Sequence, residues 1–308
     1  MMSTPLPSWN EGAAKHAILD FVGRVTQEGS KDFVPVAARI ATFDNDGTLW
    51  CEQPMQVQFF FALQRLAELA KQDPSLKERQ PFKAILDRDM KAIAALGKEG
   101  AVAFGMATHA GMTADEFDTA ARAWFAKARH PTLDRLFKDN VYQPQVELLD
   151  YLRANDFRTF IVSGGGIDLI RAFAEEKYGI ARDQVIGSSV KSRFEMRNER
   201  AEIVKLAELD SFDDREVKPA NIYLHIGRRP ILAFGNSDGD LAMLRYARTG
   251  PGPSLALLLH HDDGEREFAY DREFRLSPLA EGLDKADEYG ITVVSMRKDW
   301  AAIFGGKS

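Results

Sequence analysis

The chain has 308 residues, of which 45% are hydrophobic and 28% are charged, a composition typical of one large globular domain or a domain with a smaller partner. The formal net charge of −6 excludes a predominantly basic surface of the kind that binds nucleic acid. The single Cys51 excludes an internal disulfide and a cysteine-rich zinc module. No apolar run has the length of a membrane span, and the polar start of the chain lacks the apolar core of a secretory signal. We therefore expect a cytoplasmic protein without nucleic-acid or membrane partners, although a chain whose leader had been removed would look the same; composition does not predict its oligomeric state.

The first part of the chain is predicted to contain one buried strand between helices. Apolar residues at helical spacing predict an amphipathic helix over residues 11–27. The apolar run 38–43 predicts a buried strand, which the turn-forming residues 44–48 end. Residues 54–130 keep helical spacing almost throughout, and the pattern indicates no strand there.

Strands and helices alternate again after Pro144. Helices are predicted over residues 145–154, 167–177, 219–226 and 239–247, and strands over residues 157–162, 184–187, 231–234, 254–259 and 291–295. Residues 188–209 alternate apolar and polar side chains, which predicts a β-hairpin, but residues 201–209 fit a helix equally well. This order predicts a doubly wound, parallel α/β sheet with an inserted α-helical cap domain. We expect a catalytic core of residues 1–50 and 143–308 and a helical cap of residues 51–142.

Polar residues follow the predicted strands at the edge where open α/β sheets bind ligands. Asp44 and Asp46 follow the first strand. One carboxylate of such a pair can attack phosphorus and share a metal ion, while the other protonates the leaving oxygen. Gly47 permits the backbone to turn, and Thr48 can hydrogen-bond a phosphate.

Three later segments suit an anion and a hard cation. Ser163, followed by Gly164 and two more glycines at a predicted helix start, offers a hydroxyl and open backbone N–H groups to an anion. Lys218 precedes Pro219, a favoured first helical residue, where a cation opposes the helix dipole and so indicates an anionic partner. Residues 235–240, Gly-Asn-Ser-Asp-Gly-Asp, carry oxygen ligands suited to Mg²⁺.

Together these segments resemble the motifs of the haloacid dehalogenase superfamily, on its phosphatase side. The DxDGT-type first motif is matched by residues 43–49, the second by Phe-Ile-Val-Ser at 160–163, the third by Lys218 and the fourth by residues 235–244. The first motif is specific, whereas Ser163 or Lys218 alone is weak; the order of all four, each at a strand end, makes the resemblance strong. The cap resembles the helical cap of phosphoserine-phosphatase-like members.

The resemblance implies a role for each motif residue. Asp44 is the nucleophile, and Asp46 is the general acid and later the base. Ser163 and Lys218 hold the phosphoryl oxygens, with Thr48 and Gly164 beside them. Asp44, the backbone carbonyl of Asp46 and the fourth motif hold Mg²⁺. The implied function is Mg²⁺-dependent hydrolysis of a small phosphorylated metabolite, a phosphate monoester, through an aspartyl-phosphate intermediate.

The fourth motif departs from the family at Asn236, which stands where an acidic metal ligand is usual. Asn236 assisted by Asp240 is the preferred ligand set, and Asp238 is the alternative, although its position also fits a helix N-cap. Lys205 is the second candidate for the motif lysine.

Two residues outside the motifs are predicted to contact the substrate. Glu52 lies one position from the place where phosphoserine-type relatives carry an acidic substrate-contacting residue, and His109 lies in a predicted cap loop. The run 260–263, His-His-Asp-Asp, fits a polar loop better than a metal site, because no further ligands follow at a suitable spacing.

Three competing functions remain. A 2-haloacid dehalogenase needs neither Asp46 nor the loop 235–240, which disfavours it. A phosphomutase or phosphotransferase uses the same residues, so only the product separates it from a hydrolase. A catalytically silent binding module would not be expected to keep Asp44, Asp46, Ser163 and Lys218 together, and the glycines at 164–166 do not form a dinucleotide-binding fingerprint.

Overall fold

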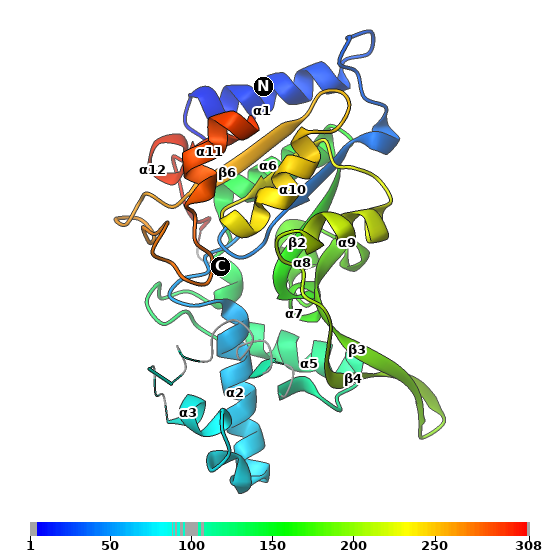
Figure 1. The fold of residues 1–308 in the computed structure, drawn as a ribbon, viewed down its shortest axis with the longest axis vertical. Coiled ribbons are helices and arrows are strands. Elements are labelled where there is room, and N and C mark those ends of the chain that lie inside the picture. Colours follow the sequence, from blue (N-terminus) through cyan, green and yellow to red (C-terminus); the bar gives the residue numbers. More distant parts are fainter. Residues whose placement is uncertain are drawn as a thin grey trace.

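The computed structural model describes residues 5–306 except 88, 90, 93, 94, 96–103, 106 and 107. The described residues form a sheet of seven strands in the order β4-β3-β2-β1-β5-β6-β7 (Figure 1). The strands are β1 (Ile40–Phe43), β2 (Arg158–Gly166), β3 (Val185–Arg197), β4 (Arg200–Ser211), β5 (Leu232–Gly235), β6 (Leu255–His260) and β7 (Thr292–Ser295). Neighbouring strands are parallel except β3 and β4. From β1, the later strands β2 and β3 lie on one side and β5, β6 and β7 on the other, which confirms the predicted doubly wound α/β sheet.

Helices accompany the strands along the chain. The α-helices are α1 (Ala13–Thr26), α2 (Val57–Gln72), α3 (Phe82–Leu86), α5 (Ala114–Phe125), α6 (Gln143–Ala154), α7 (Ile167–Arg171), α8 (Ala174–Tyr178), α9 (Val217–Ile226), α10 (Leu241–Arg248), α11 (Glu281–Tyr289) and α12 (Met296–Asp299). Short 3₁₀ helices are η1 (Val36–Ala38), η2 (Pro74–Lys77), η3 (Phe137–Asp139), η4 (Arg182–Gln184) and η5 (Asp238–Asp240). No described helix is long and apolar enough to cross a membrane.

The two faces of the sheet bury different apolar clusters. Phe43 and Phe234 pack with buried side chains of α1 and α6 on one face, for example Phe21 and Leu149. Val162, Ala233 and Leu258 pack with α9 and α10 on the other. Side chains of successive strand residues point to opposite faces, so these strands are buried on both sides, which is why they appear in the sequence as short continuous apolar runs.

The segment 51–142, predicted to be the cap, is helical wherever the structure describes its regular elements. In Figure 1, α2, α3 and α5 lie beyond the end of the sheet, and Ala62, Leu66, Ile85 and Phe104 form a small apolar cluster of their own there. Part of the predicted cap lies outside the described residues, and its status as a separate domain stays a prediction.

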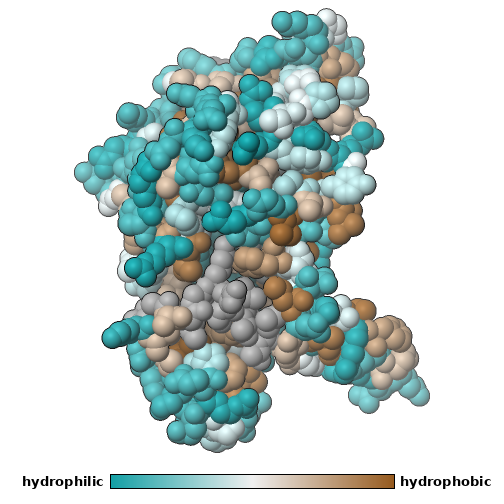
Figure 2. All heavy atoms as spheres, in the orientation of Figure 1, coloured by the Kyte–Doolittle hydropathy of each residue, from teal (hydrophilic) through white to brown (hydrophobic). Residues whose placement is uncertain are grey.

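The β3–β4 hairpin extends from the sheet and contacts this helical segment (Figure 1). The Lys205 backbone N–H donates to Met112 O at 2.9 Å, and the Gly111 N–H donates to Lys205 O at 2.9 Å. The hairpin's outer part carries exposed apolar side chains, among them Phe194 and Ile203, where Figure 2 shows hydrophobic surface. The hairpin therefore belongs to the sheet by pairing and to the helical segment by contact.

Several sequence predictions change in detail. The hairpin over residues 188–209 is confirmed, and the helical alternative for 201–209 is wrong because β4 pairs with β3 along that whole stretch. The predicted loop 163–166 continues β2 with a shift in register, and the predicted helix 167–177 is two short helices, α7 and α8. Lys218 lies inside the first turn of α9 rather than before it.

Candidate active site

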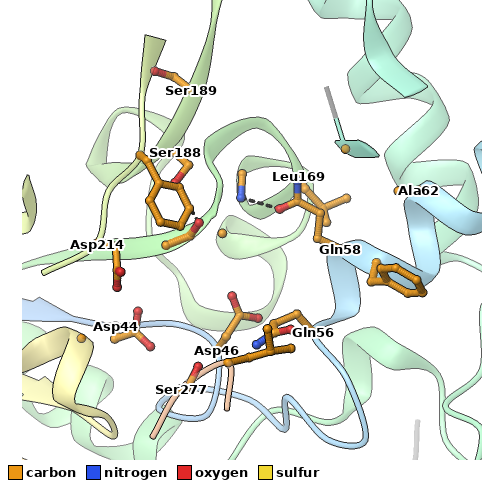
Figure 3. A pocket seen from close by; sticks show the side chains of 18 of the residues that line it. Asp44, Asp46, Gln56, Gln58, Ala62, Leu169, Ser188, Ser189, Asp214 and Ser277 are labelled. Carbon is orange, nitrogen blue, oxygen red and sulfur yellow. Dashed lines mark hydrogen bonds between the residues drawn. The ribbon is translucent and has the colours of Figure 1, made fainter. Parts of the chain in front are cut away.

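A cavity of about 420 Å³ lies at the carboxyl edge of the sheet, between the strand ends and the helical segment. Asp44 and Asp46 follow β1, Gly164 lies near the end of β2, and Lys218 and Asp240 come from α9 and η5; all five residues line the cavity. Figure 3 shows Asp44 and Asp46 on the side of this cavity that faces the sheet. Parallel strands end at one edge, so residues far apart in the sequence meet here.

Lys218 joins two carboxylates at the bottom of the cavity. Its Nζ donates to Asp44 Oδ1 at 2.7 Å, to Asp240 Oδ1 at 2.6 Å and to Val162 O at 2.8 Å, which uses all three of its protons. Burial raises the pKa of Asp44, and Lys218 opposes this shift, but Asp240 and Asp46 repel the Asp44 charge and leave its pKa well above the usual range. For Lys218, burial alone would lower the pKa, but Asp240 and Asp44 raise it above its usual value, so the ammonium stays charged.

Asp46 lies beside Ser163 and a glycine. Trp50 Nε1 donates to Asp46 Oδ1 at 2.8 Å, and burial raises the pKa of Asp46, although hydrogen bonds from Trp50 and Ser163 partly lower it. A Cβ on Gly165 would lie 2.8 Å from Asp46 Oδ2, so the close approach requires glycine. The upward shift of the Asp46 pKa is in the direction that suits the predicted acid.

The glycine segment after Ser163 is partly tied down. The Gly165 N–H donates to Ser163 Oγ at 3.0 Å, and the Gly166 N–H donates to Gln58 Oε1 at 2.6 Å. Gln58 lies on α2, so it links the helical segment to the end of β2. Sequence reasoning missed Gln58, because nothing in the local pattern of α2 distinguishes it from a solvated glutamine.

The fourth motif separates its two acidic residues. Asp240 Oδ2 accepts the backbone N–H groups of Asn236 and Ser237, both at 3.0 Å. Asp240 thereby connects this loop to Lys218 and Asp44, and these three residues are called the Asp44 cluster below. Asp238 points away: its carboxylate accepts the N–H groups of Ala280 and Gly282, at the start of α11. Asp238 is therefore not the N-cap of the helix that follows it, where Ser237 is the N-cap of η5; its contacts at the start of α11 disfavour Asp238 as a metal ligand.

Thr48, Glu52 and Asn236 form a buried group under Gly47. Thr48 Oγ1 donates to Asn236 Oδ1 at 3.0 Å, and Asn236 Nδ2 donates to Glu52 Oε1 at 3.1 Å. The Tyr270 hydroxyl donates to the same Glu52 oxygen at 2.9 Å. A Cβ on Gly47, whose φ is +80°, would lie 2.1 Å from Asn236 Nδ2, so this position also requires glycine.

Thr48 and Glu52, both expected near the substrate, have protein partners in this group. The Thr48 hydroxyl is directed at Asn236 rather than toward a phosphate. Glu52 is 0% exposed and does not line the cavity, so its carboxylate orients the Asn236 amide instead of reaching a substrate. Burial raises the pKa of Glu52 well above its usual range, and the charge of Asp46 adds to the shift. Tyr270 was missed, since it comes from a loop more than two hundred residues away in the chain.

His109 and Lys205 line the other part of the cavity. His109 packs on Phe117 with 4.7 Å between the ring centroids, and burial lowers the pKa of His109 to about 4. Lys205 forms an ion pair with Asp168, and its Nζ lies 5.0 Å from the centroid of the Phe117 ring. Lys205 therefore has other partners than the Asp44 cluster, which favours Lys218 as the motif lysine.

The low pKa of His109 predicts a pH-dependent contribution to stability. The folded state binds this proton only near pH 4, while the unfolded chain binds it near 6.5, so the unfolded state binds more protons between these values. The neutral His109 ring therefore contributes its full amount to the free energy of unfolding above pH 6.5, and this amount is lost as the pH falls toward 4. Between pH 7 and 4.5, the free energy of unfolding should fall by about 2 to 3 kcal/mol more in the wild type than in His109→Phe, measured by urea unfolding. Equal losses of unfolding free energy in the wild type and in His109→Phe would contradict the lowered pKa of His109.

The polar loop 260–263 has structural partners in the described structure. His261 Nε2 lies 2.8 Å from Gly47 O, and His261 Nδ1 lies 3.3 Å from Glu267 Oε2. Asp262 accepts the Arg297 N–H, and Asp263 pairs with Arg266. This loop packs against the turn after β1 through the contact of His261 with Gly47.

The doubly wound sheet and the buried acidic cluster at its carboxyl edge define an α/β protein with its site where such folds bind ligands. The sequence model of the haloacid dehalogenase-like hydrolase family matches residues 41–245, more than half of the chain. The chain therefore belongs to the haloacid dehalogenase-like hydrolase family, as its four motifs predict.

Several solved structures are similar to this chain at low sequence identity, and the first two named below have TM-scores above 0.5. A conserved, functionally unknown protein from Anaerococcus prevotii DSM 20548 is 17% identical with a TM-score of 0.58, covering 92% of this chain and 91% of that one. A protein with unknown function from Bordetella pertussis Tohama I is 15% identical with a TM-score of 0.52, covering 83% and 98%. A phosphoserine phosphohydrolase-like protein from Francisella tularensis subsp. tularensis SCHU S4 is 16% identical with a TM-score of 0.42, covering 81% and 98%. The comparison with curated proteins finds no match.

Proposed function

We propose that this protein is a phosphatase that hydrolyses small phosphate monoesters through an aspartyl-phosphate on Asp44. The observation that carries the proposal is the buried cluster in which Lys218 bridges Asp44 and Asp240 beside Asp46 and the Ser163 hydroxyl. A nucleophile, an acid and a cation for the phosphoryl group thus line one cavity. The predicted helical cap, residues 51–142, would enclose the substrate over the strand ends.

The residues perform the reaction in two steps. In the first, an Asp44 oxygen bonds to phosphorus, the ester P–O bond breaks, and the Asp46 carboxyl gives its proton to the leaving oxygen. In the second, Asp46 takes a proton from a water molecule, whose oxygen bonds to phosphorus and releases phosphate from Asp44. Lys218 and Ser163 would hold the phosphoryl oxygens during both steps, for which Lys218 must exchange one of its three present hydrogen bonds for a phosphoryl oxygen.

The charges and oxygen atoms of the site fit a divalent cation. Asp44 and Asp240 pair with the Lys218 ammonium, and Asp46 and Glu52 are further carboxyl groups nearby; the pKa values of Asp44, Asp46 and Glu52 are raised. Among the described residues, no three Asp, Glu, His or Cys side chains form a metal-binding group by themselves. The Asp44 carboxylate, the Asp46 carbonyl and the Asn236 amide oxygen would hold Mg²⁺, with Asp240 behind them. The ion would neutralise charge on the phosphoryl group.

Removal of Mg²⁺ should abolish activity. We expect a chelator to stop turnover and added Mg²⁺ to restore it, because the carboxylates otherwise repel the phosphoryl group. Asn236→Ala should weaken Mg²⁺ binding at least about tenfold in calorimetry, a typical effect of losing a ligand or its support. Asp238→Ala should leave Mg²⁺ binding unchanged and instead lower the free energy of unfolding by about 1 kcal/mol, through loss of the α11 cap. The reverse order of the two Mg²⁺ affinities would assign Asp238 as the ligand.

The assay that tests the function is release of free phosphate from a nitrophenyl phosphate, with and without Mg²⁺. Free phosphate from metabolite phosphates would support a hydrolase, while an isomerised or transferred phosphate ester would identify a mutase or phosphotransferase. Release of halide from a 2-haloacid with no phosphatase activity would identify a dehalogenase. Absence of both activities in the folded, Mg²⁺-loaded protein would indicate a silent binding module.

A further inference from the structure

The cavity extends from the Asp44 cluster to a wall formed by the helical segment and the hairpin. Figure 3 shows Ala62 and Leu169 across the cavity from Asp44 and Asp46. Apolar side chains from α2, α5, α7 and β4 dominate this wall: Phe59, Ala62, Phe117, Leu169 and Leu209, together with Phe104. Phe59 and Phe104 lie 5.6 Å apart between ring centroids, so part of the wall is aromatic. A phosphate ester with its phosphorus at Asp44 would direct its alcohol part toward this wall.

The charged side chains that line the cavity away from the Asp44 cluster either pair with one another or are exposed to solvent, and Asp214 Oδ2 lies 3.9 Å from Arg215 Nε. Lys205 pairs with Asp168 and lies over the Phe117 ring, so neither charge needs a counter-ion from a ligand. Arg215 and Arg275 also line the cavity, but both are exposed to solvent, where a contact between charges contributes little. A charged alcohol part would lose its hydration against this wall without gaining a buried partner.

His109 adds an uncharged hydrogen-bond acceptor. Its pKa of about 4 leaves the ring neutral at pH 7. Thr108 Oγ1 donates to Gly105 O at 2.7 Å and lies 3.3 Å from His109 Nδ1, so the Thr108 oxygen can only accept the Nδ1 proton. The ring therefore carries no proton on Nε2, which has no hydrogen-bond partner among the described residues. His109 thus adds a neutral ring to the wall, and this Nε2 atom is itself buried behind the wall surface.

We propose that the cavity selects phosphate esters of neutral, largely apolar alcohols, aromatic ones included, over esters with charged alcohol parts. This inference rests on the proposed phosphatase function. The selection is made by the apolar wall that α2, α5 and α7 share with the hairpin, and the Asp44 cluster acts on any ester that fits. It disfavours phosphoserine, whose alcohol part carries an ammonium and a carboxylate, as the preferred substrate.

Matched substrates test the selection. 2-Phenylethyl phosphate and 2-aminoethyl phosphate are both primary esters with a two-carbon chain, and ethyl phosphate is the short reference. We expect kcat/KM for the phenyl compound to exceed that for ethyl phosphate by about 10- to 100-fold, the usual gain from burying a side chain of that size. The amino compound should fall below ethyl phosphate. A kcat/KM for the amino compound equal to or above that of the phenyl compound would overturn the proposal.

Two variants of the same strand locate the selection. Leu209 lines the cavity and is 37% exposed, while Ile203, also on β4, is 48% exposed and does not line the cavity. Both are exposed enough for Asp to be tolerated. Leu209→Asp should lower kcat/KM for 2-phenylethyl phosphate at least about tenfold and change that for ethyl phosphate less than about twofold. Ile203→Asp should change neither. Equal effects of the two variants would overturn the assignment of the wall.

The selection and the phosphatase function can fail separately. If ethyl and 2-aminoethyl phosphate are hydrolysed and the phenyl compound is not, the phosphatase function stands and the selection is wrong. If no ester is hydrolysed, the function fails, and calorimetric binding of 2-phenylethyl phosphate then tests the wall alone. The selection would be supported if 2-phenylethyl phosphate bound more tightly than 2-aminoethyl phosphate and if Leu209→Asp lost this difference in affinity. Equal affinities for the two compounds would overturn it.

Discussion

Asp44→Asn is expected to lower turnover of a nitrophenyl phosphate by at least about a thousand-fold, because an amide cannot attack phosphorus. The substitution keeps the size of the side chain, and Lys218 can still donate to the remaining carbonyl oxygen, so the fold should survive. Steady-state release of nitrophenol measures the loss, and far-UV circular dichroism with a thermal melt checks the fold. The wild type, quenched during turnover, should carry the mass of one phosphoryl group, and Asp44→Asn should not.

Asp46→Asn is the matched control for this variant, since it removes the acid and leaves the nucleophile. Its rate should fall much more on ethyl phosphate than on the nitrophenyl ester, whose leaving group needs little protonation. Substantial turnover by folded Asp44→Asn would refute the covalent mechanism. An equal loss on both substrates in Asp46→Asn would contradict its role as the acid.

The motif residues were predictable because their signals are local. Asp44 and Asn236 directly follow short apolar strands, Ser163 ends the apolar run of β2, and a doubly wound sheet brings such residues to one edge. The chain pattern therefore predicted the sheet and the meeting of the motifs without any knowledge of distances. Lys218 had a weaker local signal, a cation in the first turn of a helix, and its hydrogen bonds to Asp44 and Asp240 explain that position.

The surroundings of the motifs were not predictable, because they depend on contacts between distant segments. Glu52 was expected at the substrate, but its carboxylate meets Tyr270, which lies 218 residues further along the chain. Gln58 reaches the Gly166 N–H across 108 residues. Asp238 was expected to cap the helix that follows it, but its carboxylate binds N–H groups at the start of α11, a helix that was not predicted. The apolar residues of α11 lie at helical spacing, but they are too few to distinguish the segment from a polar loop.

The function of the hairpin was hidden for a related reason. Alternating apolar residues predicted strands over residues 188–209. In the structure, however, some of these apolar residues are exposed and others line the cavity or pack on the helical segment. Ile203 is exposed, while Leu209 lines the cavity and Val204 is buried against the helical segment, where it forms a bridge with Thr113. Period-two patterning indicates the faces of a strand but not which surface covers each face.

Lys218→Met is expected to cause the second large loss, and Lys205→Met is its matched control. Lys218 neutralises two buried carboxylates and offers its charge to the phosphoryl group, so its removal should lower kcat on acetyl phosphate by about 100- to 1,000-fold. It also leaves Asp44 and Asp240 without their shared partner, which should lower the free energy of unfolding by about 3 to 5 kcal/mol.

The pH dependence distinguishes this charge effect from a packing defect. Without Lys218, the buried carboxylates of the folded protein should bind protons more readily than those of the unfolded chain. The stability difference between Lys218→Met and the wild type should therefore shrink as the pH falls from 8 to 5, measured by urea unfolding at each pH. A packing defect would give the same difference at every pH.

Lys205→Met removes a lysine of similar burial that also lines the cavity, but its partners are Asp168 and the Phe117 ring. No hydrogen bond or ion pair in the described structure joins Lys205 to Asp44, Asp46 or Asp240, and acetyl phosphate has only a small leaving group. We therefore expect kcat on acetyl phosphate to change less than about tenfold in this variant. A larger loss in Lys205→Met than in Lys218→Met would make Lys205 the lysine that holds the phosphoryl group. It would also require the hairpin to move toward Asp44 when the substrate binds.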